Sequence, residues 1–140
     1  MNNHMRLEFD AISQNELFAR NVVALFALPL EPSLSELSDV KTAVSEAVTN
    51  CIVHAYREEA GEITIEVKLC EGRLIRIDIR DRGCGIENVK QAREPLFTTD
   101  AAGERSGMGF TVMESFCDEL RVTSRKDRGT TVTLLKRLHK

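Results

Sequence analysis

Three polar side chains recur at steps of four in the segment VSEAVTNCIVH, which runs from Val44 to His54. Glu46, Asn50 and His54 offer a carboxylate base, an amide oxygen that can ligate a metal, and a hydrogen-bonding ring. In a helix this spacing stacks them on one face, one turn above another. A polar helix face is ordinarily solvated, so the segment by itself is compatible with either a solvated surface or a functional site.

Two glycine-bearing segments further along the chain could approach a phosphate-containing ligand. DRGCGI (81–86) follows an expected strand, where its glycines permit either a tight turn or close backbone approach to a ligand. RSGMGF (105–110) stands where a loop becomes a helix, and it offers backbone N–H groups beside an arginine, or only a flexible helix start. The chain has no GxxxxGK[ST] motif, which excludes a P-loop, and Asn88 replaces the third glycine of a dinucleotide-binding fingerprint.

The helix that carries Glu46 must be held by an apolar stripe. We expect it to run from Ser35 to about Tyr56, with its polar face on a side different from the stripe. The stripe consists of Leu37, Val40, Val44, Val48, Cys51 and Ala55.

An earlier strand and helix are expected to flank the central helix. Residues 6–12 alternate apolar and charged side chains, as in a half-buried strand. Ser13 and Glu16 match a capping box for a helix that Pro29 helps to end. The apolar stripe of this helix consists of Leu17, Phe18, Val22, Leu25 and Phe26. Arg20 lies off that stripe, where an arginine is ordinarily solvated.

The remaining segments complete an α+β pattern. Strands are expected over 63–69 and 74–80 as a hairpin, and over 119–124 and 130–135 as another. Between the hairpins come a short polar helix, an irregular stretch typical of a lid or a binding loop, and a helix from Gly109. This order predicts a two-layer α/β sandwich, with helices on one face of a mixed, mostly antiparallel sheet, in one domain spanning 1–140.

Composition narrows the classes of function. Hydrophobic residues make up 42% and charged residues 29% of the chain, which is typical of a globular protein rather than a disordered one. A net charge of −3 at pH 7 argues against direct nucleic-acid binding. The four cysteines form no CxxC pair, which favours reduced thiols in a cytoplasmic protein, and no apolar run is long enough for a membrane span.

Four segments occur in an informative order: the helix with Glu46 and Asn50, DxGxG from Asp81, GxG from Gly107, and GTT from Gly129. This order resembles the Bergerat (GHKL) ATP-binding fold shared by gyrase, histidine kinases and MutL. VSEAVTNCIVHAY, EPLFTT and ERSGMGFTVME resemble more closely the small serine kinases that double as anti-sigma factors. The resemblance covers essentially the whole chain. It departs from the usual pattern at DAAG (100–103), where a lysine-led lid segment is more usual.

The resemblance implies a Mg²⁺-ATP site. Asn50 would ligate Mg²⁺, Glu46 would act as general base toward a substrate serine, and Asp81 would accept a hydrogen bond from the adenine amino group. Thr130 would assist at the adenine end, and a lid over about 97–108 would close over the phosphates. The implied nucleotide-binding residues are Asn50, His54, Asp81, Gly83, Gly85, Ile86, Thr98, Thr99, Arg105, Ser106, Gly107, Met108, Gly109, Phe110 and Thr130.

The resemblance also implies protein partners. These are a sporulation sigma factor of the sigma-F type, an anti-anti-sigma protein that supplies the substrate serine, and a second copy of the chain in a homodimer, with Arg20 contacting partner proteins. Two alternatives are a stress-response (sigma-B type) anti-sigma kinase and a nucleotide-sensing module that transfers no phosphate. A histidine-kinase catalytic domain is disfavoured, because His4, His54 and His139 are not followed by an acidic residue.

Overall fold

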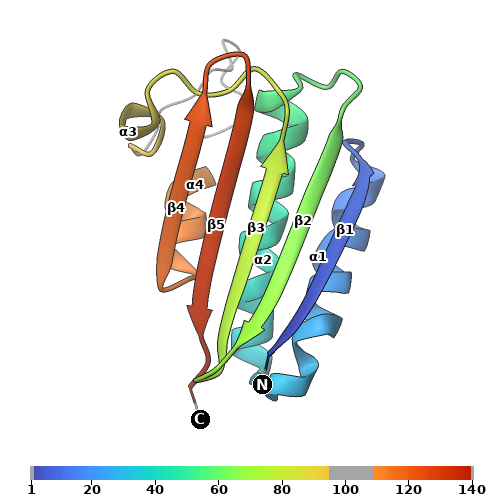
Figure 1. Cartoon of the computed structure of the whole chain (residues 1–140), viewed down its shortest axis with the longest axis vertical. Helices are drawn as coiled ribbons and strands as arrows, with labels where there is room; N and C mark the ends of the chain where they lie inside the picture. The colour runs from blue at the N-terminus through green and yellow to red at the C-terminus, as the bar shows by residue number, and fades with distance from the viewer. Residues whose placement is uncertain (1, 95–108, 140) are drawn as a thin grey trace.

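A computed structural model of the chain describes residues 2–94 and 109–139, which build a five-stranded sheet in the order β1-β2-β3-β5-β4 (Figure 1). Every pairing between neighbouring strands is antiparallel. The expectation of a mixed sheet was therefore wrong, because β5 inserts between β3 and β4 and runs antiparallel to both. The strands are β1 (Asn3–Asp10), β2 (Glu62–Cys70), β3 (Leu74–Asp81), β4 (Glu119–Arg125) and β5 (Gly129–Arg137).

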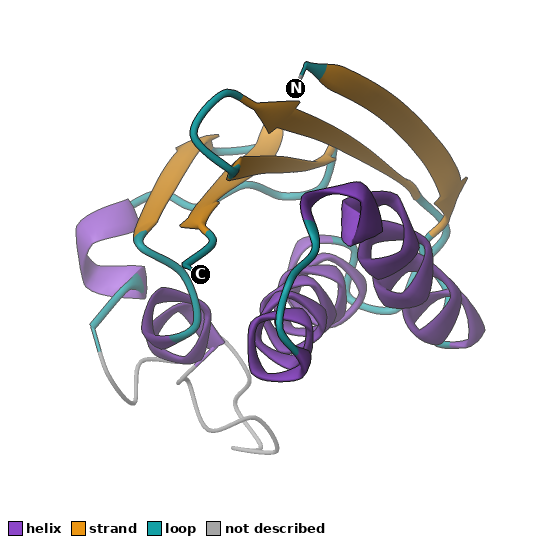
Figure 2. Cartoon of the chain, turned by 90° about the horizontal axis from the view of Figure 1, so that it is seen from below, coloured by secondary structure: helices purple, strands orange, loops and turns teal. Residues whose placement is uncertain are grey.

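Three helices cover one face of the sheet, so the predicted two-layer α+β architecture is confirmed (Figure 2). They are α1 (Gln14–Ala27), α2 (Leu34–Asn50) and α4 (Gly109–Ser115). The short helix α3 (Val89–Ala92) lies beside β4, and a 3₁₀ turn, η1 (Leu28–Leu30), follows α1. Within the described residues, no helix combines the length and the apolar character that crossing a membrane requires.

The core lies between α2 and the inner face of the sheet. Strands β2 and β3 alternate, so that Ile65 and Ile77 point inward and are at most 2% exposed. The stripe of α2 packs on them through Val44 and Val48, both fully buried. Full burial of an aliphatic side chain contributes about 1.5–3 kcal/mol. This packing sets the rotation of α2 and thereby the direction of its polar face, on which Glu46 lies.

Most of the apolar stripe expected on α1 was assigned to the wrong face, although Phe26 does pack against the core. The face that packs inward consists of small residues, namely Ala19, Val23, Ala24 and Ala27. Leu17, Phe18 and Leu25 are instead 53%, 50% and 66% exposed. Small side chains allow α1 to lie close to α2, which leaves the bulky residues on the far side. The result is an exposed apolar face on α1. Ile12 and Leu28, which flank the helix in sequence, are also about half exposed.

The capping box forms at the central helix rather than at the first. Ser13 has helical φ and ψ and makes no side-chain cap, so the box predicted there is wrong, and Glu16 lies 3.5 Å from Arg20 instead. Ser33 has extended backbone, and its Oγ accepts a hydrogen bond from the N–H of Glu36 (3.0 Å). The Glu36 carboxylate accepts one from the N–H of Ser33 (2.9 Å). The central helix therefore begins just before the predicted Ser35.

The central helix ends in a wider turn than predicted. After Asn50 the chain continues as a π-helical turn, η2 (Cys51–Ala55), in which the N–H of Tyr56 donates to the carbonyl of Cys51 (2.9 Å). Single π turns inside helices often occur at functional sites. The wider turn also means that His54 does not continue the regular i+4 row that Glu46 and Asn50 begin.

Candidate functional site

A cavity of about 970 Å³ opens between α2, η2, the segment 81–88 and the start of α4. This is within the usual range for small-molecule sites. Residues 95–108 lie outside the described chain, and with them the predicted lid residues Thr98, Thr99, Arg105, Ser106, Gly107 and Met108. Arg20 lies on α1, away from the cavity lining. Nine predicted residues line the cavity: Glu46, Asn50, His54, Asp81, Gly85, Ile86, Gly109, Phe110 and Thr130.

Asp81, the last residue of β3, places a carboxylate in the cavity lining while remaining only 9% exposed. The N–H of Gly83 donates to Oδ1 (2.9 Å), and the thiol of Cys51 donates to Oδ2 (3.5 Å). Burial raises the pKa of Asp81, whereas these hydrogen bonds act in the opposite direction. Because both oxygens are held, the carboxylate has one orientation in which to accept a further hydrogen bond from a ligand.

The segment after Asp81 packs directly on the π turn. The N–H of Cys84 donates to the carbonyl of Ala55 (2.9 Å), and its thiol donates to the carbonyl of His54 (3.4 Å). A Cβ atom on Gly83 would overlap the backbone of Ala55. Glycine is therefore needed at position 83, because the backbone there lies directly against η2.

The other side of the same segment packs on the turn between β4 and β5. Gly85 has φ of +72°, and a Cβ atom there would overlap the carbonyl of Arg125. The N–H of Asp127 donates to the carbonyl of Cys84 (2.6 Å), and the N–H of Ile86 donates to Ser124 Oγ (2.7 Å). The cavity wall is thus held from both sides by hydrogen bonds that main-chain N–H groups donate.

Ser124, which sequence reasoning missed, connects this wall to Thr130. Its hydroxyl donates to the carbonyl of Gly129 (3.0 Å) and lies 2.7 Å from Thr130 Oγ1. Since Ser124 has one proton, Thr130 donates to Ser124 and keeps lone pairs of its own to accept from a ligand. Thr130 lies opposite Asp81 in the β3–β5 register, so the two side chains form one end of the cavity.

Tyr56 was also missed, and it fixes the junction of η2 with β2 and the end of β3. Its hydroxyl donates to the carbonyl of Glu62 (2.6 Å) and accepts from the N–H of Arg82 (2.7 Å). Burial raises the pKa of Tyr56, which keeps this hydroxyl protonated. No local pattern marks Tyr56, because its contacts join segments that are distant in sequence.

At the other end of the cavity, Asn50 meets the start of α4. A Cβ atom on Gly109 would come within 3.0 Å of both Asn50 Oδ1 and Nδ2. The described residues hold no group of three His, Cys, Asp or Glu side chains that could bind a metal by themselves. The side-chain oxygen of Asn50 is a hard ligand of the kind that Mg²⁺ accepts. Arg57 and Lys126 also line the cavity and add positive charge that no motif predicted.

The cavity lies within an α+β sandwich and has a buried carboxylate at one end and a helix-borne amide at the other. This arrangement is typical of the ATP-binding domains of histidine kinases and their relatives. The sequence model of the family described as "Histidine kinase-like ATPase domain" matches residues 12–136. The chain is 52% identical to the anti-sigma F factor of Anoxybacillus flavithermus, over all of this chain and 96% of that protein. It is 53% identical to that of Clostridium perfringens, over 99% of both chains. The chain belongs to the histidine kinase-like ATPase family and, within it, to the anti-sigma F factors.

Solved structures agree on the fold. The RsbU and RsbW domains of a Mycobacterium tuberculosis protein superpose with a TM-score of 0.72 at 21% identity, over 99% of this chain and 33% of that one. The mycobacterial sensor histidine kinase MprB superposes with a TM-score of 0.61 at 14% identity, over 98% and 99% of the two chains. At these identities the likeness concerns the fold alone.

Proposed function

We propose that this protein is an anti-sigma factor that also acts as a Mg²⁺-ATP-dependent protein serine kinase. It binds a sporulation sigma factor of the sigma-F type, and it phosphorylates a serine of an anti-anti-sigma protein, which inactivates that protein. The observation that carries the proposal is the placement of Glu46, Asn50 and Asp81 around one cavity. Support comes from full-length relatives named anti-sigma F factor at 52–53% identity.

The adenine end is formed by Asp81 and Thr130. The oriented carboxylate of Asp81 accepts a hydrogen bond from the adenine amino group, and Thr130 Oγ1 offers a further acceptor beside it. Gly83 and Gly85 hold the wall against which the base lies. A site built to hydrogen-bond an amino group discriminates strongly against a base that lacks it, because its buried polar group is then left unpaired.

The phosphate end is formed by Asn50 and Gly109. Asn50 would hold Mg²⁺ through its side-chain oxygen, and the bound metal ion would neutralise charge on the phosphate oxygens. The lid residues, Arg105 and its neighbours, are proposed to close over the phosphates. Glu46 lies one turn before Asn50 on α2, and we assign it as the general base.

The transfer step needs little covalent chemistry from the protein. The substrate serine hydroxyl gives its proton to Glu46, and its oxygen forms a bond to the γ-phosphorus as the bond to the β–γ bridging oxygen of ADP breaks. His54 lines the cavity, and no proton transfer in this step requires it.

The protein partners are proposed to use α1. Arg20 has a side chain 36% exposed, and Glu16 at 3.5 Å restrains it. The exposed apolar face of α1, carrying Leu17, Phe18 and Leu25, lies on the same helix. Apolar patches of this kind commonly mark protein interfaces. We assign this face to the homodimer, with Arg20 contacting the sigma factor and the anti-anti-sigma protein.

The experiment that tests the kinase assignment follows transfer of ³²P from [γ-³²P]ATP to the anti-anti-sigma protein. Glu46→Gln should lower the rate at least about a hundredfold with ATP affinity retained, since the base contributes mainly in the transition state. Glu59→Gln, in the exposed turn before β2, is the matched control and should transfer at the wild-type rate. Unchanged transfer by Glu46→Gln would refute the base assignment. No transfer by the wild type would favour the nucleotide-sensing module.

Two binding measurements separate the remaining roles. Asn50→Ala should remove the Mg²⁺ dependence of ATP binding in isothermal titration while the far-UV circular dichroism stays unchanged. Arg20→Ala should weaken binding of the sigma factor and leave ATP affinity unchanged. Loss of ATP binding by Arg20→Ala would contradict its placement on a protein-binding surface.

A further inference from the structure

The helices leave one face of the sheet uncovered (Figure 2). A second cavity, of about 610 Å³, is lined in part by residues of that face. Thr64, Arg80, Thr131 and Thr123 follow one another in register across four strands, and they alternate with inward-facing residues such as Ile65. We call this cavity the outer groove. The arginines that line it are Arg6, Arg80, Arg82, Arg125 and Arg128.

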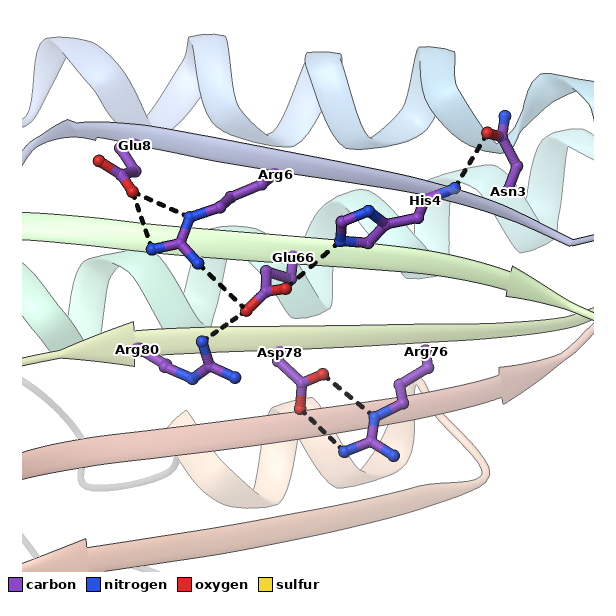
Figure 3. Close-up of polar contacts among 8 residues, drawn as sticks. All are labelled: Asn3, His4, Arg6, Glu8, Glu66, Arg76, Asp78 and Arg80. Atoms are coloured by element: carbon purple, nitrogen blue, oxygen red, sulfur yellow. Dashed lines mark hydrogen bonds and ion pairs between the residues drawn. The ribbon is translucent and has the colours of Figure 1, made fainter.

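The outer groove has uncompensated positive charge. Arg6 lies 2.9 Å from Glu8 and Arg80 lies 2.5 Å from Glu66, so each of these two arginines has a carboxylate partner of its own on the sheet (Figure 3). Arg82, Arg125 and Arg128 are exposed, and they form no ion pair with any residue of 2–94 or 109–139. A cluster of three unpaired guanidinium groups is notable on a chain whose net charge is −3.

The backbone holds these three arginines in place. The N–H of Arg82 donates to the Tyr56 hydroxyl (2.7 Å), and the N–H of Arg128 donates to the carbonyl of Arg125 (3.0 Å). The turn that carries Arg125 and Arg128 is anchored by the bond from Asp127 N–H to Cys84 (2.6 Å). Charged groups on a fixed backbone lose less entropy on binding than groups on a mobile loop.

We propose that the outer groove binds an acidic segment of a partner protein. Carboxylates of that segment pair with Arg82, Arg125 and Arg128, because the planar guanidinium matches a carboxylate with two parallel hydrogen bonds. The threonine hydroxyls on the groove floor serve its remaining polar groups. A short protein segment fits better than a nucleic acid, because the net charge of −3 on the whole chain would repel a longer polyanion.

This site is separate from the proposed kinase chemistry, although Asp81 and Thr130 border both cavities. The three unpaired arginines do not line the nucleotide cavity. Substituting them therefore tests the outer groove without removing any residue that we place in ATP binding or phosphoryl transfer.

The test measures binding of fluorescein-labelled decaglutamate to the full chain by fluorescence anisotropy. The triple variant Arg82→Gln, Arg125→Gln, Arg128→Gln should bind it about tenfold or more weakly than the wild type. The control variant Lys68→Gln, Lys90→Gln, Arg121→Gln removes the same charge from exposed residues outside the groove, and it should lose less than about threefold. Both variants should keep wild-type ATP affinity and melting temperature.

Three results would overturn the proposal. The first is no measurable binding of decaglutamate by the wild type, and the second is an equal loss in both triple variants, which would indicate a general charge effect. The third concerns labelled decathymidylate: if it binds more tightly than decaglutamate and is lost only in the groove variant, the groove takes nucleic acid. Labelled decaglutamine is the neutral control peptide, and it should bind neither to the wild type nor to the groove variant.

Discussion

The thiol of Cys51 donates a hydrogen bond to Oδ2 of Asp81 across 3.5 Å, at the junction of the central helix with β3. Both residues are nearly buried, at 3% and 9% exposure. Burial, reinforced by the nearby Asp81 charge, holds the pKa of Cys51 well above its usual value, so the thiol keeps its proton. Gly83 N–H holds the other carboxylate oxygen. Cys51 is therefore a positioning residue for the carboxylate that we assign to adenine.

Cys51→Ala should weaken ATP binding about two- to tenfold, because it removes a hydrogen bond worth about 0.5–1.5 kcal/mol. Cys51→Ser restores a donor, and it should bind ATP more tightly than Cys51→Ala in isothermal titration. Cys70→Ala, on β2 outside the cavity, is the matched control and should bind ATP as the wild type does. Equal weakening by the alanine and serine variants would show that volume, rather than the donated proton, is what matters.

Asp81→Asn should separate ligand binding from stability. The amide cannot replace a carboxylate acceptor on both oxygens, so ATP affinity should fall at least about tenfold. Burial raises the pKa of Asp81 in the folded state, so its contribution to stability is present below the unfolded pKa and is lost as the pH rises through the folded pKa.

The free energy of unfolding, measured with urea, checks the sign of this effect. Between about pH 7 and about pH 4 the wild type should gain stability relative to Asp81→Asn, because only the wild type takes up the proton. Glu62→Gln, an exposed carboxylate at the start of β2, is a suitable control. If the wild type instead lost stability relative to Asp81→Asn on acidification, the pKa of Asp81 would be lowered in the folded state.

The sequence predicted a structural feature where the residues that determine it lie in one short segment, and failed where they lie far apart in the chain. The stripe that buries Val44 and Val48 is a periodicity within one helix, and the glycines at 83 and 85 follow directly on a strand. Both features could therefore be predicted from short windows. The face of α1 could not, because hydrophobicity favours large residues such as Leu25, whereas close helix packing selects small ones. The contacts of Tyr56 and Ser124 join distant segments, and no short window contains them.

The two Ser-x-x-Glu segments should differ in stability although their sequence patterns match. Ser33→Ala removes an observed cap and should lower the free energy of unfolding by about 1 kcal/mol. Ser13→Ala removes no cap and should change it by less than about 0.5 kcal/mol. Urea unfolding at neutral pH measures both variants, and equal losses would contradict the assignment of the cap to Ser33.

The pH dependence of Glu36 gives a second test of the same cap. The hydrogen bond from Ser33 N–H is the largest cause that lowers the pKa of Glu36 in the folded state. The contribution of ionised Glu36 to stability is therefore present above the unfolded pKa and is lost as the pH falls through the folded pKa. Glu36→Gln should therefore be less stable than the wild type near pH 7, and the difference should shrink toward about pH 3. A difference that grows on acidification would contradict this sign.

The exposed face of α1 should control the oligomeric state. Leu25 is 66% exposed and lies on the helix that also exposes Leu17 and Phe18, so Leu25→Glu should place a charge in the proposed homodimer interface. Burying an unpaired charge is strongly unfavourable, and the variant should sediment as a monomer where the wild type sediments as a dimer. Its ATP affinity should be retained, because α1 does not line the nucleotide cavity.

Leu34→Glu is the matched control for Leu25→Glu, because Leu34 is 86% exposed but belongs to the first turn of α2. Leu34→Glu should sediment with the same coefficient as the wild type. This would show that the loss of the dimer in Leu25→Glu depends on the position of the new charge. A dimer that survives Leu25→Glu would place the interface elsewhere. A wild type that is monomeric at all accessible concentrations would remove the homodimer from the proposed function, and the apolar face of α1 would then be assigned to the sigma factor alone.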